Sequence, residues 1–232
     1  MPRLILCAAL LSAAAQAQQI PDRDYLPAVT QPLHAVGTGP AVCVDEAHAN
    51  FHTLGERLFA FGALLRRDGY RVTANKLAFG AAALQPCRVL VISNARVSGD
   101  ASSAFTADEI AAVHTWVEDG GALLLIADHM PFGGAAARLA AAFDVEFSNG
   151  FAMREAVNRV RTFTGQPFRA PRAEALLVMP PDFIGLMPKE PWKFEADTPR
   201  FPVKGWLRGA VQKEGAGRAA FFGEAAMLDG TL

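Results

Sequence analysis

The sequence predicts an α/β domain in which helices cover both faces of a mostly parallel sheet. Short apolar runs alternate with segments of helical period, which is the order expected of strand–helix–strand units. The runs are apolar on both strand faces, as in parallel sheets that are buried on both sides. The chain has 232 residues, 51% of them hydrophobic, and is therefore long enough for one domain with a substantial core.

Five apolar runs are expected to be strands of this sheet. The run LLLIA is the clearest, because it is apolar throughout and is followed directly by polar residues. The five runs are Ala41–Val44, Tyr70–Thr73, Arg88–Ser93, Leu123–Ala127 and Val145–Phe147.

Two capping boxes predict where helices begin. In the first, the Thr53 hydroxyl and the Glu56 carboxylate would accept hydrogen bonds from opposing backbone N–H groups. Apolar residues at helical spacing follow this box as far as Leu65. Thr106 and Glu109 form the second box, and a pair of glycines ends the helix that follows it.

A third helix, Ala135–Ala142, completes the pattern of a three-layer α/β/α sandwich with a flavodoxin-like sheet. The periodicity weakens beyond Asn149, but Gly205–Val211 and Arg218–Gly223 predict a hairpin. We expect residues 41–232 to form a single domain. The chain ends soon after the last predicted strand, which leaves open a truncated C-terminus.

The N-terminal segment, residues 1–17, has the three regions of a secretory signal peptide. Arg3 supplies the positive charge, an apolar stretch follows, and Ala15–Ala17 matches an A-x-A cleavage site. Cleavage after Ala17 would leave an extended lead-in, 18–40, and a periplasmic or secreted protein. No later stretch is long enough to span a membrane. The alternative is a hydrophobic N-terminal helix that is retained.

Two cysteines, Cys43 and Cys87, remain after this cleavage. An exported protein can form a disulfide, so the two could pair if their strands are neighbours. We expect two buried thiols instead, because neighbouring strands rarely meet the geometry of a disulfide.

Polar side chains follow the predicted strands at the points where the strands end. The carboxyl ends of parallel strands meet at one edge of a sheet, and sheets of this class bind their ligands there. We therefore expect a polar pocket at this edge that takes a small polar ligand. Its residues would be Asp45, Glu46, His48, Asn50, His52, Asn94, Asp128, His129 and Glu224.

Asp45, Glu46, Asp128 and His129 are the catalytic candidates, since general acid–base chemistry needs only a carboxylate beside an imidazole. Adjacent residues usually point apart, so a pair between strands, Asp45 or Glu46 with His129, is favoured over Asp128 with His129. A structural alternative stays open, in which Asp45 and Asp128 cap helices and the imidazoles bind loop carbonyls.

His48 and His52 are the candidate ligands of a divalent metal, with the neighbouring carboxylates completing the site. The first capping box places both in a loop, so their spacing of four residues matches no metal motif. A lone histidine on a helix is usually packed or solvated, and His114 is interpreted as structural.

Gly133 and Gly134 open the third helix, where backbone N–H groups suit a carboxylate or phosphate. With Asn50, Asn94 and Glu224 they are the expected ligand-binding residues. The chain contains no P-loop, G-x-G-x-x-G or G-x-S-x-G motif, so no nucleotide cofactor is expected. A net charge of −1 gives no basis for a nucleic-acid partner.

Four runs of the chain carry a family resemblance. They are VDEAHANFHT (Val44–Thr53), LLLIADHMPFGGAA (Leu123–Ala136), RTFTGQPF (Arg161–Phe168) and GRAAFFGEAAM (Gly217–Met227). With them the chain resembles an uncharacterised bacterial family, a domain of unknown function with a class I glutamine amidotransferase-like fold. The resemblance covers nearly all of the mature chain. It implies a flavodoxin-like sandwich and an exported protein, and it implies no known activity.

True class I amidotransferases use a Cys–His–Glu triad, which this chain lacks. The turn Ala127–Met130, where the cysteine would stand, contains none, and all five histidines precede residue 130. Glu224 could be the late carboxylate, but a thiolate mechanism needs both a nucleophile and a base. Glutaminase chemistry by this route is therefore excluded.

Two classes of function remain. The first is a hydrolase or lyase that uses the Asp, Glu and His residues as acid–base groups, with or without a divalent metal that activates water. The second is a non-catalytic domain that binds a sugar or a carboxylate at the same edge. A third, weaker alternative is a scaffold in which Trp192 and Trp206 anchor an envelope protein.

Overall fold

The computed structural model describes residues 23–24, 26, 28–99, 101–155 and 161–228. The predicted signal peptide, 1–17, and the first part of the lead-in lie outside the described residues. In the part of the chain that is described, no helix has the length and apolar character needed to span a bilayer.

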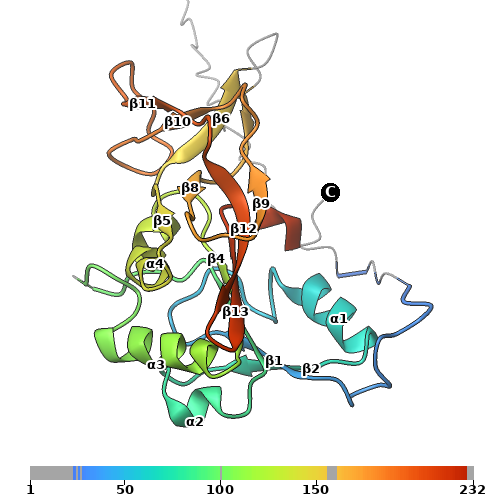
Figure 1. Ribbon diagram of the computed structural model, residues 1–232. Coiled ribbons are helices and arrows are strands. Elements are labelled where there is room, and N and C mark those ends of the chain that lie inside the picture. The colour runs from blue at the N-terminus through green and yellow to red at the C-terminus, as the bar shows by residue number, and fades with distance from the viewer. Residues whose placement is uncertain (1–22, 25, 27, 100, 156–160, 229–232) are drawn as a thin grey trace, which may run out of the picture.

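A nine-stranded sheet forms the centre of the molecule (Figure 1). Five of its strands run parallel, in the order β2-β1-β3-β4-β13. They are β2 (Arg71–Asn75), β1 (Ala41–Asp45), β3 (Val89–Ser93), β4 (Ala122–Ile126) and β13 (Gly217–Phe222). Antiparallel strands extend the sheet from β13, and they are β12 (Leu207–Glu214), β8 (Phe168–Arg169), β9 (Ala175–Val178) and β5 (Glu146–Phe147).

Helices cover both faces of the parallel strands (Figure 1). Helix α1 (Phe59–Arg67) lies on one face, and α2 (Ala81–Leu84), α3 (Ala107–Glu118) and α4 (Phe132–Ala141) lie on the other. The strands alternate between two apolar clusters, as a period of two requires. Val42, Val44 and Val91 pack toward α1, whereas Cys43, Leu90 and Ile92 pack toward α3 and α4.

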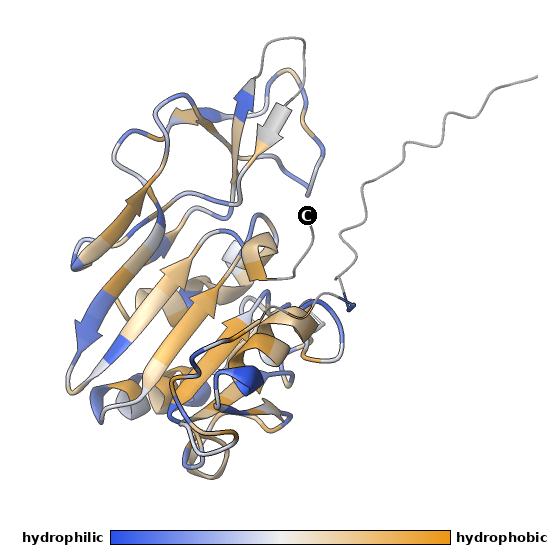
Figure 2. Ribbon diagram, turned by 90° about the vertical axis from the view of Figure 1, so that its right-hand side faces the viewer, coloured by the Kyte–Doolittle hydropathy of each residue, from blue (hydrophilic) through white to orange (hydrophobic). Residues whose placement is uncertain are grey.

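This arrangement confirms the predicted three-layer α/β/α sandwich with a mostly parallel central portion. Figure 2 shows the parallel strands among the most hydrophobic elements of the molecule, as expected for strands buried on both faces. The five predicted strands are present with shifts of one or two residues at their ends. The second capping box is also confirmed, because the Thr106 side chain accepts from the Glu109 N–H and the Glu109 carboxylate accepts from the Thr106 N–H.

The first predicted helix begins later than expected. Helix α1 starts at Phe59 rather than just after Thr53, and no side chain caps it. The Leu54 N–H donates to the Glu46 carboxylate at 2.9 Å, and the chain turns back on the Thr53 carbonyl before the helix begins. The Glu46 carboxylate, eight residues before Leu54, therefore takes the place of the predicted capping box.

The expectation of two buried thiols is wrong, because Cys43 and Cys87 form a disulfide. Their Cα atoms lie 5.7 Å apart, within the usual range for this bond. Cys43 pairs with Leu90 across β1 and β3, whereas Cys87 lies just before β3. Because Cys87 is outside the paired strand, the fixed distance between cross-strand neighbours does not apply to it.

The second half of the chain contains a four-stranded sheet that the sequence did not predict. It has the order β11-β10-β6-β7 and lies beyond the edge at which the parallel strands end (Figure 1). Its strands are β11 (Arg200–Pro202), β10 (Ile184–Leu186), β6 (Phe151–Glu155) and β7 (Arg161–Phe163). The predicted hairpin is present as β12 and β13.

Candidate functional site

The strand register brings the predicted site residues to one edge of the main sheet. Ser93 at the end of β3 pairs with Ile126 at the end of β4, and Val44 of β1 pairs with Val91 of β3. The segments that follow β1 and β4 therefore emerge on the same side, with the end of β3 between them. The second sheet lies on that side of the molecule (Figure 1).

A buried network of two carboxylates and one imidazole lies after β1. Nδ1 of His48 is 2.9 Å from both carboxylate oxygens of Asp45, and Nε2 of His48 is 2.9 Å from Oε1 of Glu109. Phe79 and Phe105 pack against the His48 ring with centroid distances of 4.5 and 4.8 Å. All three polar residues of the network are buried.

The carboxylates favour the protonated form of His48. Burial alone would lower the pKa of His48, but the hydrogen bonds and charges of Asp45 and Glu109 outweigh it and leave that pKa raised. Burial likewise would raise the pKa of Glu109, yet hydrogen bonds from the Thr106 backbone, His48, the Thr106 hydroxyl and the Phe79 backbone lower it to about 2. Both ring nitrogens of His48 are therefore engaged by carboxylates, which favour the charged form of the ring.

Amide side chains tie this network to the neighbouring strand ends. Nδ2 of Asn50 donates to Asp45 at 3.0 Å and to the Ser93 carbonyl at 3.3 Å. Oδ1 of Asn94 accepts from the Asp128 N–H at 2.9 Å, and Asn94 has a left-handed backbone with φ of 48°. Both amides are buried and hold the loops at this edge.

The remaining carboxylates and His52 also have protein partners. Nδ1 of the buried His52 contacts the Ser93 hydroxyl at 2.9 Å. Asp128 accepts from the His129 N–H at 2.7 Å, and Glu46 accepts from the Leu54 N–H. Oε1 of Glu224 accepts from the N–H groups of two following residues at the short helical turn Ala226–Leu228. The predicted polar residues thus hydrogen-bond largely within the protein.

His129 lies apart from this network, in an aromatic cluster. Its ring stacks on Phe151 at 4.7 Å and contacts Trp192 and Phe163 edge-on at 4.6 and 5.2 Å. Nδ1 is 2.6 Å from the Met130 carbonyl and so donates to it, while Nε2 has no hydrogen-bond partner among the described residues. Burial lowers the pKa of His129 more than the Met130 carbonyl raises it, so the ring is neutral at pH 7.

The first turn of α4 differs from the anion site expected at Gly133 and Gly134. The Gly134 N–H already donates to Oδ1 of Asn149 at 2.7 Å. A Cβ at Gly133 would lie 2.4 Å from the amide of Gln166, so glycine is required there for close packing. At the start of α4, the Gly134 N–H therefore binds a side chain of the protein instead of an anion.

The structure brings together some of the predicted residues and separates others. Asp45 lies with His48 and Asn50, and Asn94 lies with Asp128. The expected pair between Asp45 or Glu46 and His129 does not form, because Asp45 binds His48 and Glu46 binds the Leu54 backbone. Within the described part of the chain, His48 and His52 likewise belong to no common group of ligand atoms suited to a metal.

Sequence reasoning missed Glu109 as a partner of His48 and missed every aromatic neighbour of His129 on the second sheet. The second capping box drew attention to Glu109, but it predicted only the start of a helix and not a contact with His48. Sequence reasoning also interpreted His114 as a lone structural histidine, without carboxylate neighbours. In the described part of the chain His114, Glu118 and Glu214 bring three ligand atoms within 4.8 Å of one another.

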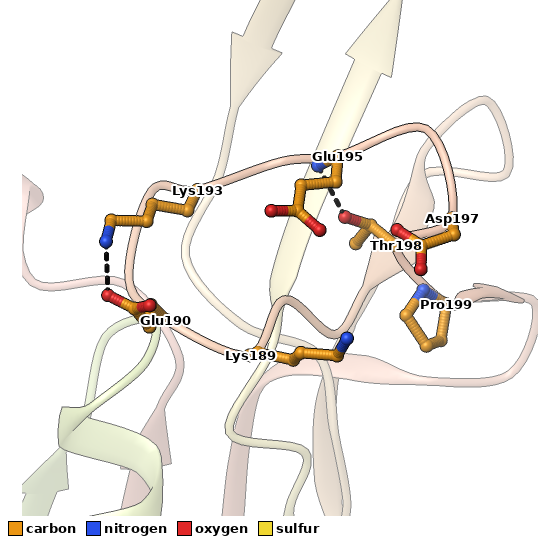
Figure 3. Close-up of a pocket in the computed structure, with 7 residues that line it drawn as sticks. All are labelled: Lys189, Glu190, Lys193, Glu195, Asp197, Thr198 and Pro199. Atoms are coloured by element: carbon orange, nitrogen blue, oxygen red, sulfur yellow. Dashed lines mark hydrogen bonds and ion pairs between the residues drawn. The ribbon is translucent and has the colours of Figure 1, made fainter.

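The hollows of the surface lie at the second sheet and the antiparallel strands. One, of about 170 Å³, lies at the second sheet and is lined by Met153, Ile184, Leu186, Phe194, Glu195, Ala196, Thr198 and Arg200. Another, of about 120 Å³, is formed by the loop that carries Lys189, Glu190, Lys193, Glu195, Asp197, Thr198 and Pro199. Figure 3 shows that Lys193 pairs with Glu190 and that the Glu195 backbone donates to Thr198.

Two wider hollows share Glu146 and Arg169, and Trp206 lines one of them. None of these four hollows is lined by a residue of the predicted polar pocket. The residues that line these four hollows therefore all belong to the second half of the chain.

Comparison with known proteins supports the fold alone. No model of a known protein family matches the chain, and no curated protein matches it. Among solved structures it is similar to the mmIFT52 N-terminal domain, with 14% identity over 81% of this chain and 87% of that chain and a TM-score of 0.54. An identity this low says nothing about activity.

Other solved structures are more distant. A putative ThuA-like protein from Bacteroides uniformis has 14% identity over 82% of this chain and 85% of that chain, with a TM-score of 0.37. The exo-beta-1,4-mannosidase Op5Man5 from Opitutaceae bacterium strain TAV5 has 14% identity and a TM-score of 0.44. The match covers 82% of this chain and 32% of that enzyme. No conclusion about this protein is drawn from either.

Proposed function

We propose that the protein is an exported small-ligand-binding domain of the amidotransferase-like fold that binds a neutral sugar beside Trp192 and His129. The observation that carries this proposal is an aromatic surface next to a hollow with polar groups. Trp192 has a side chain 51% exposed, contacts the His129 ring and has a left-handed backbone with φ of 64°. Such backbone conformations in a non-glycine residue often accompany function.

The aromatic surface continues into the hollow of the second sheet. Phe194 contacts Trp192 and Phe151, with ring centroids 6.3 and 5.0 Å apart, and also lines the hollow of about 170 Å³. Glu195 and Arg200 line the same hollow and can bind hydroxyl groups. Apolar rings with a few polar groups are the usual composition of a site for a small ligand.

A neutral sugar fits this site better than a carboxylate does. Because the pKa of His129 is lowered, its ring offers an uncharged acceptor at Nε2 and no positive charge. The Gly134 N–H, which would have attracted an anion, is occupied by Asn149. Sugar hydroxyls can donate to an imidazole nitrogen, while the C–H face of the sugar packs on the Trp192 ring.

A binding role also fits the distribution of the acidic groups. A hydrolase would need a nucleophile or an activated water close to a base. His48 is buried with a carboxylate on each ring nitrogen, whereas His129 has no hydrogen bond from its ring to a carboxylate among the described residues. Hydrolysis remains the second candidate, because a neutral imidazole with an available Nε2 could act as a base.

The proposal of export is supported by the Cys43–Cys87 disulfide. Such bonds persist in oxidising compartments and are rare in the cytosol. This agrees with the signal peptide expected at residues 1–17, and we propose the periplasm or the exterior as the location. It leaves open an envelope protein as an additional partner.

The test is a binding titration of the mature chain, residues 18–232, followed by tryptophan fluorescence and calorimetry. Glucose, galactose, mannose and cellobiose would serve as neutral sugars, and glucuronate as the anionic comparison. Trp192→Ala should abolish binding of any neutral sugar that the native chain binds. Trp206→Phe is the matched control, because Trp206 packs on Phe201 and Arg169 away from Trp192.

Each outcome bears on the proposal. Binding of a neutral sugar that is lost in Trp192→Ala and kept in Trp206→Phe supports it. Equal binding by both variants, or binding of glucuronate alone, contradicts it. Turnover of aryl glycosides, esters or amides that disappears in His129→Gln would replace it by the hydrolase alternative.

A further inference from the structure

We infer that His114, Glu118 and Glu214 form a binding site for a divalent transition-metal ion such as Zn²⁺. This site is independent of the proposed sugar site. Glu214 pairs with Gly217 at the start of β13, so the group lies at the opposite edge of the parallel strands from His129. It uses none of the residues that sequence analysis assigned to a metal.

The backbone fixes the three side chains relative to one another. His114 and Glu118 are four residues apart on α3 and therefore lie on one face of that helix. Glu214 ends β12, and the tight turn after it places the Ala216 N–H 2.8 Å from the Glu118 carbonyl. Gly215 has φ of 57°, and a Cβ there would lie 2.6 Å from the same carbonyl. The hairpin is thus held on the last turn of the helix.

One ligand atom from each of the three side chains lies within 4.8 Å of the other two. Nδ1 of His114 is 3.3 Å from Oε2 of Glu118, and Nε2 is 3.8 Å from Oε1 of Glu214. Ligands of a tetrahedral zinc ion lie roughly 3.4 Å apart, given Zn–N and Zn–O bonds of about 2.1 Å. Because His114 supplies only one nitrogen, one carboxylate must approach it more closely. Glu118, whose side chain is 47% exposed, is free to make this movement.

Neighbouring residues orient the ligands and set the charge. Arg172 binds Oε2 of Glu214 and lies 2.8 Å from Asp144, which leaves Oε1 of Glu214 facing His114. The hydrogen bond to Glu214 is the main cause that raises the pKa of Arg172, so its charge is permanent. Three carboxylates against one guanidinium leave a negative patch beside His114. A divalent cation would offset that charge.

The donor set is one nitrogen and two carboxylate oxygens, which is within the ligand range of Zn²⁺ and other first-row ions. Three protein ligands leave a fourth position for water or another group. Phe143 packs on the His114 ring at 5.0 Å and restricts its orientation. A bound ion would join α3 to the β12–β13 hairpin and therefore stabilise the fold by an amount that grows with the logarithm of its concentration over its Kd.

The experiment is a Zn²⁺ titration of the tag-free mature chain by calorimetry, together with thermal unfolding at several Zn²⁺ concentrations. The variants are Glu118→Gln, which changes a half-exposed side chain, and His114→Gln. The controls are Glu190→Gln, which removes an exposed carboxylate in the loop at 189–199, and His34→Gln, which removes a histidine of the lead-in. Circular dichroism without metal verifies that each variant is folded.

The inference predicts one bound Zn²⁺ per chain, with a Kd at least tenfold weaker in Glu118→Gln and His114→Gln than in the controls. Zn²⁺ should raise the unfolding temperature of the native chain and of both controls. The inference is overturned if the native chain binds no Zn²⁺ at millimolar concentration. It is equally overturned if Glu118→Gln and His114→Gln bind as tightly as the controls.

Discussion

The Asp45–His48–Glu109 network and the aromatic cluster around His129 lie at the same edge of the main sheet, but they surround their imidazoles differently. His48 has a carboxylate on each ring nitrogen, and its pKa is raised. His129 has aromatic rings around it and a carbonyl on one nitrogen, and its pKa is lowered. Two histidines at the same edge of a sheet can therefore have opposite environments, one that favours the charged ring and one that favours the neutral ring.

The largest expected effect is that of His48→Phe. This change leaves the Asp45 and Glu109 carboxylates buried without their cation, which typically costs about 3–5 kcal/mol of unfolding free energy. Urea denaturation at pH 7 would measure it. A cost below about 1 kcal/mol would show that the network does not stabilise the fold and would remove the contrast with His129.

Removal of the disulfide should have the next largest effect. Cys43 and Cys87 close a loop with a sequence separation of 44 residues, for which chain entropy gives a stabilisation of about 4 kcal/mol. We expect Cys43→Ser with Cys87→Ser to lose about 2–4 kcal/mol in denaturant unfolding, because residual structure in the reduced, unfolded chain lowers the entropy that the bond removes. Thiol titration of the unfolded native chain is the control. Two free thiols in an oxidised preparation would contradict the bond.

Acid should weaken the network through Glu109. A pKa lowered from 4.5 to about 2 means that Glu109 stabilises the fold above pH 4.5, and that this contribution of about 3 kcal/mol is lost as the pH falls toward 2. The raised pKa of His48 works in the other direction, since its contribution is full below pH 6.5 and is lost as the pH rises through the folded value.

Unfolding free energies of the native chain and of Glu109→Gln would be compared between pH 6 and pH 3. The native chain should lose more stability than the variant over this range. Parallel losses in the two proteins would mean that Glu109 is not the titrating group.

The smallest effect on stability is expected for His129→Phe. Phenylalanine can keep the packing on Phe151 and Trp192, so the unfolding free energy should change by less than about 1.5 kcal/mol. The same change removes Nε2 and should therefore weaken sugar binding at least tenfold. A destabilisation as large as that of His48→Phe would show that His129 is structural as well.

The sequence predicted the parts of the fold that local patterns encode. The runs that became β1, β3 and β4 are apolar on both faces, and the Thr106–Glu109 capping box lies within four residues. The box at Thr53 failed because the Glu46 carboxylate, which the fold brings near, takes the Leu54 N–H instead. The small sheet was missed because its strands have only three to five residues, too few to show a period.

The candidate site was predicted only as a location. The edge of the sheet follows from the strand order, and Asp45, His48, Asn50 and Asn94 do lie there. Their partners could not be predicted, because Glu109 is 61 residues from His48 and the aromatic neighbours of His129 come from the weakly periodic second half. Contacts between residues so far apart in the sequence depend on how the elements of the fold pack against one another.

The most direct test of the contrast is an NMR titration of both imidazoles in one sample of the native chain, assigned with His48→Phe and His129→Phe. We expect a midpoint above 6.5 for His48 and a midpoint below 6.5 for His129. Midpoints in the reverse order, or one shared value near 6.5, would contradict it.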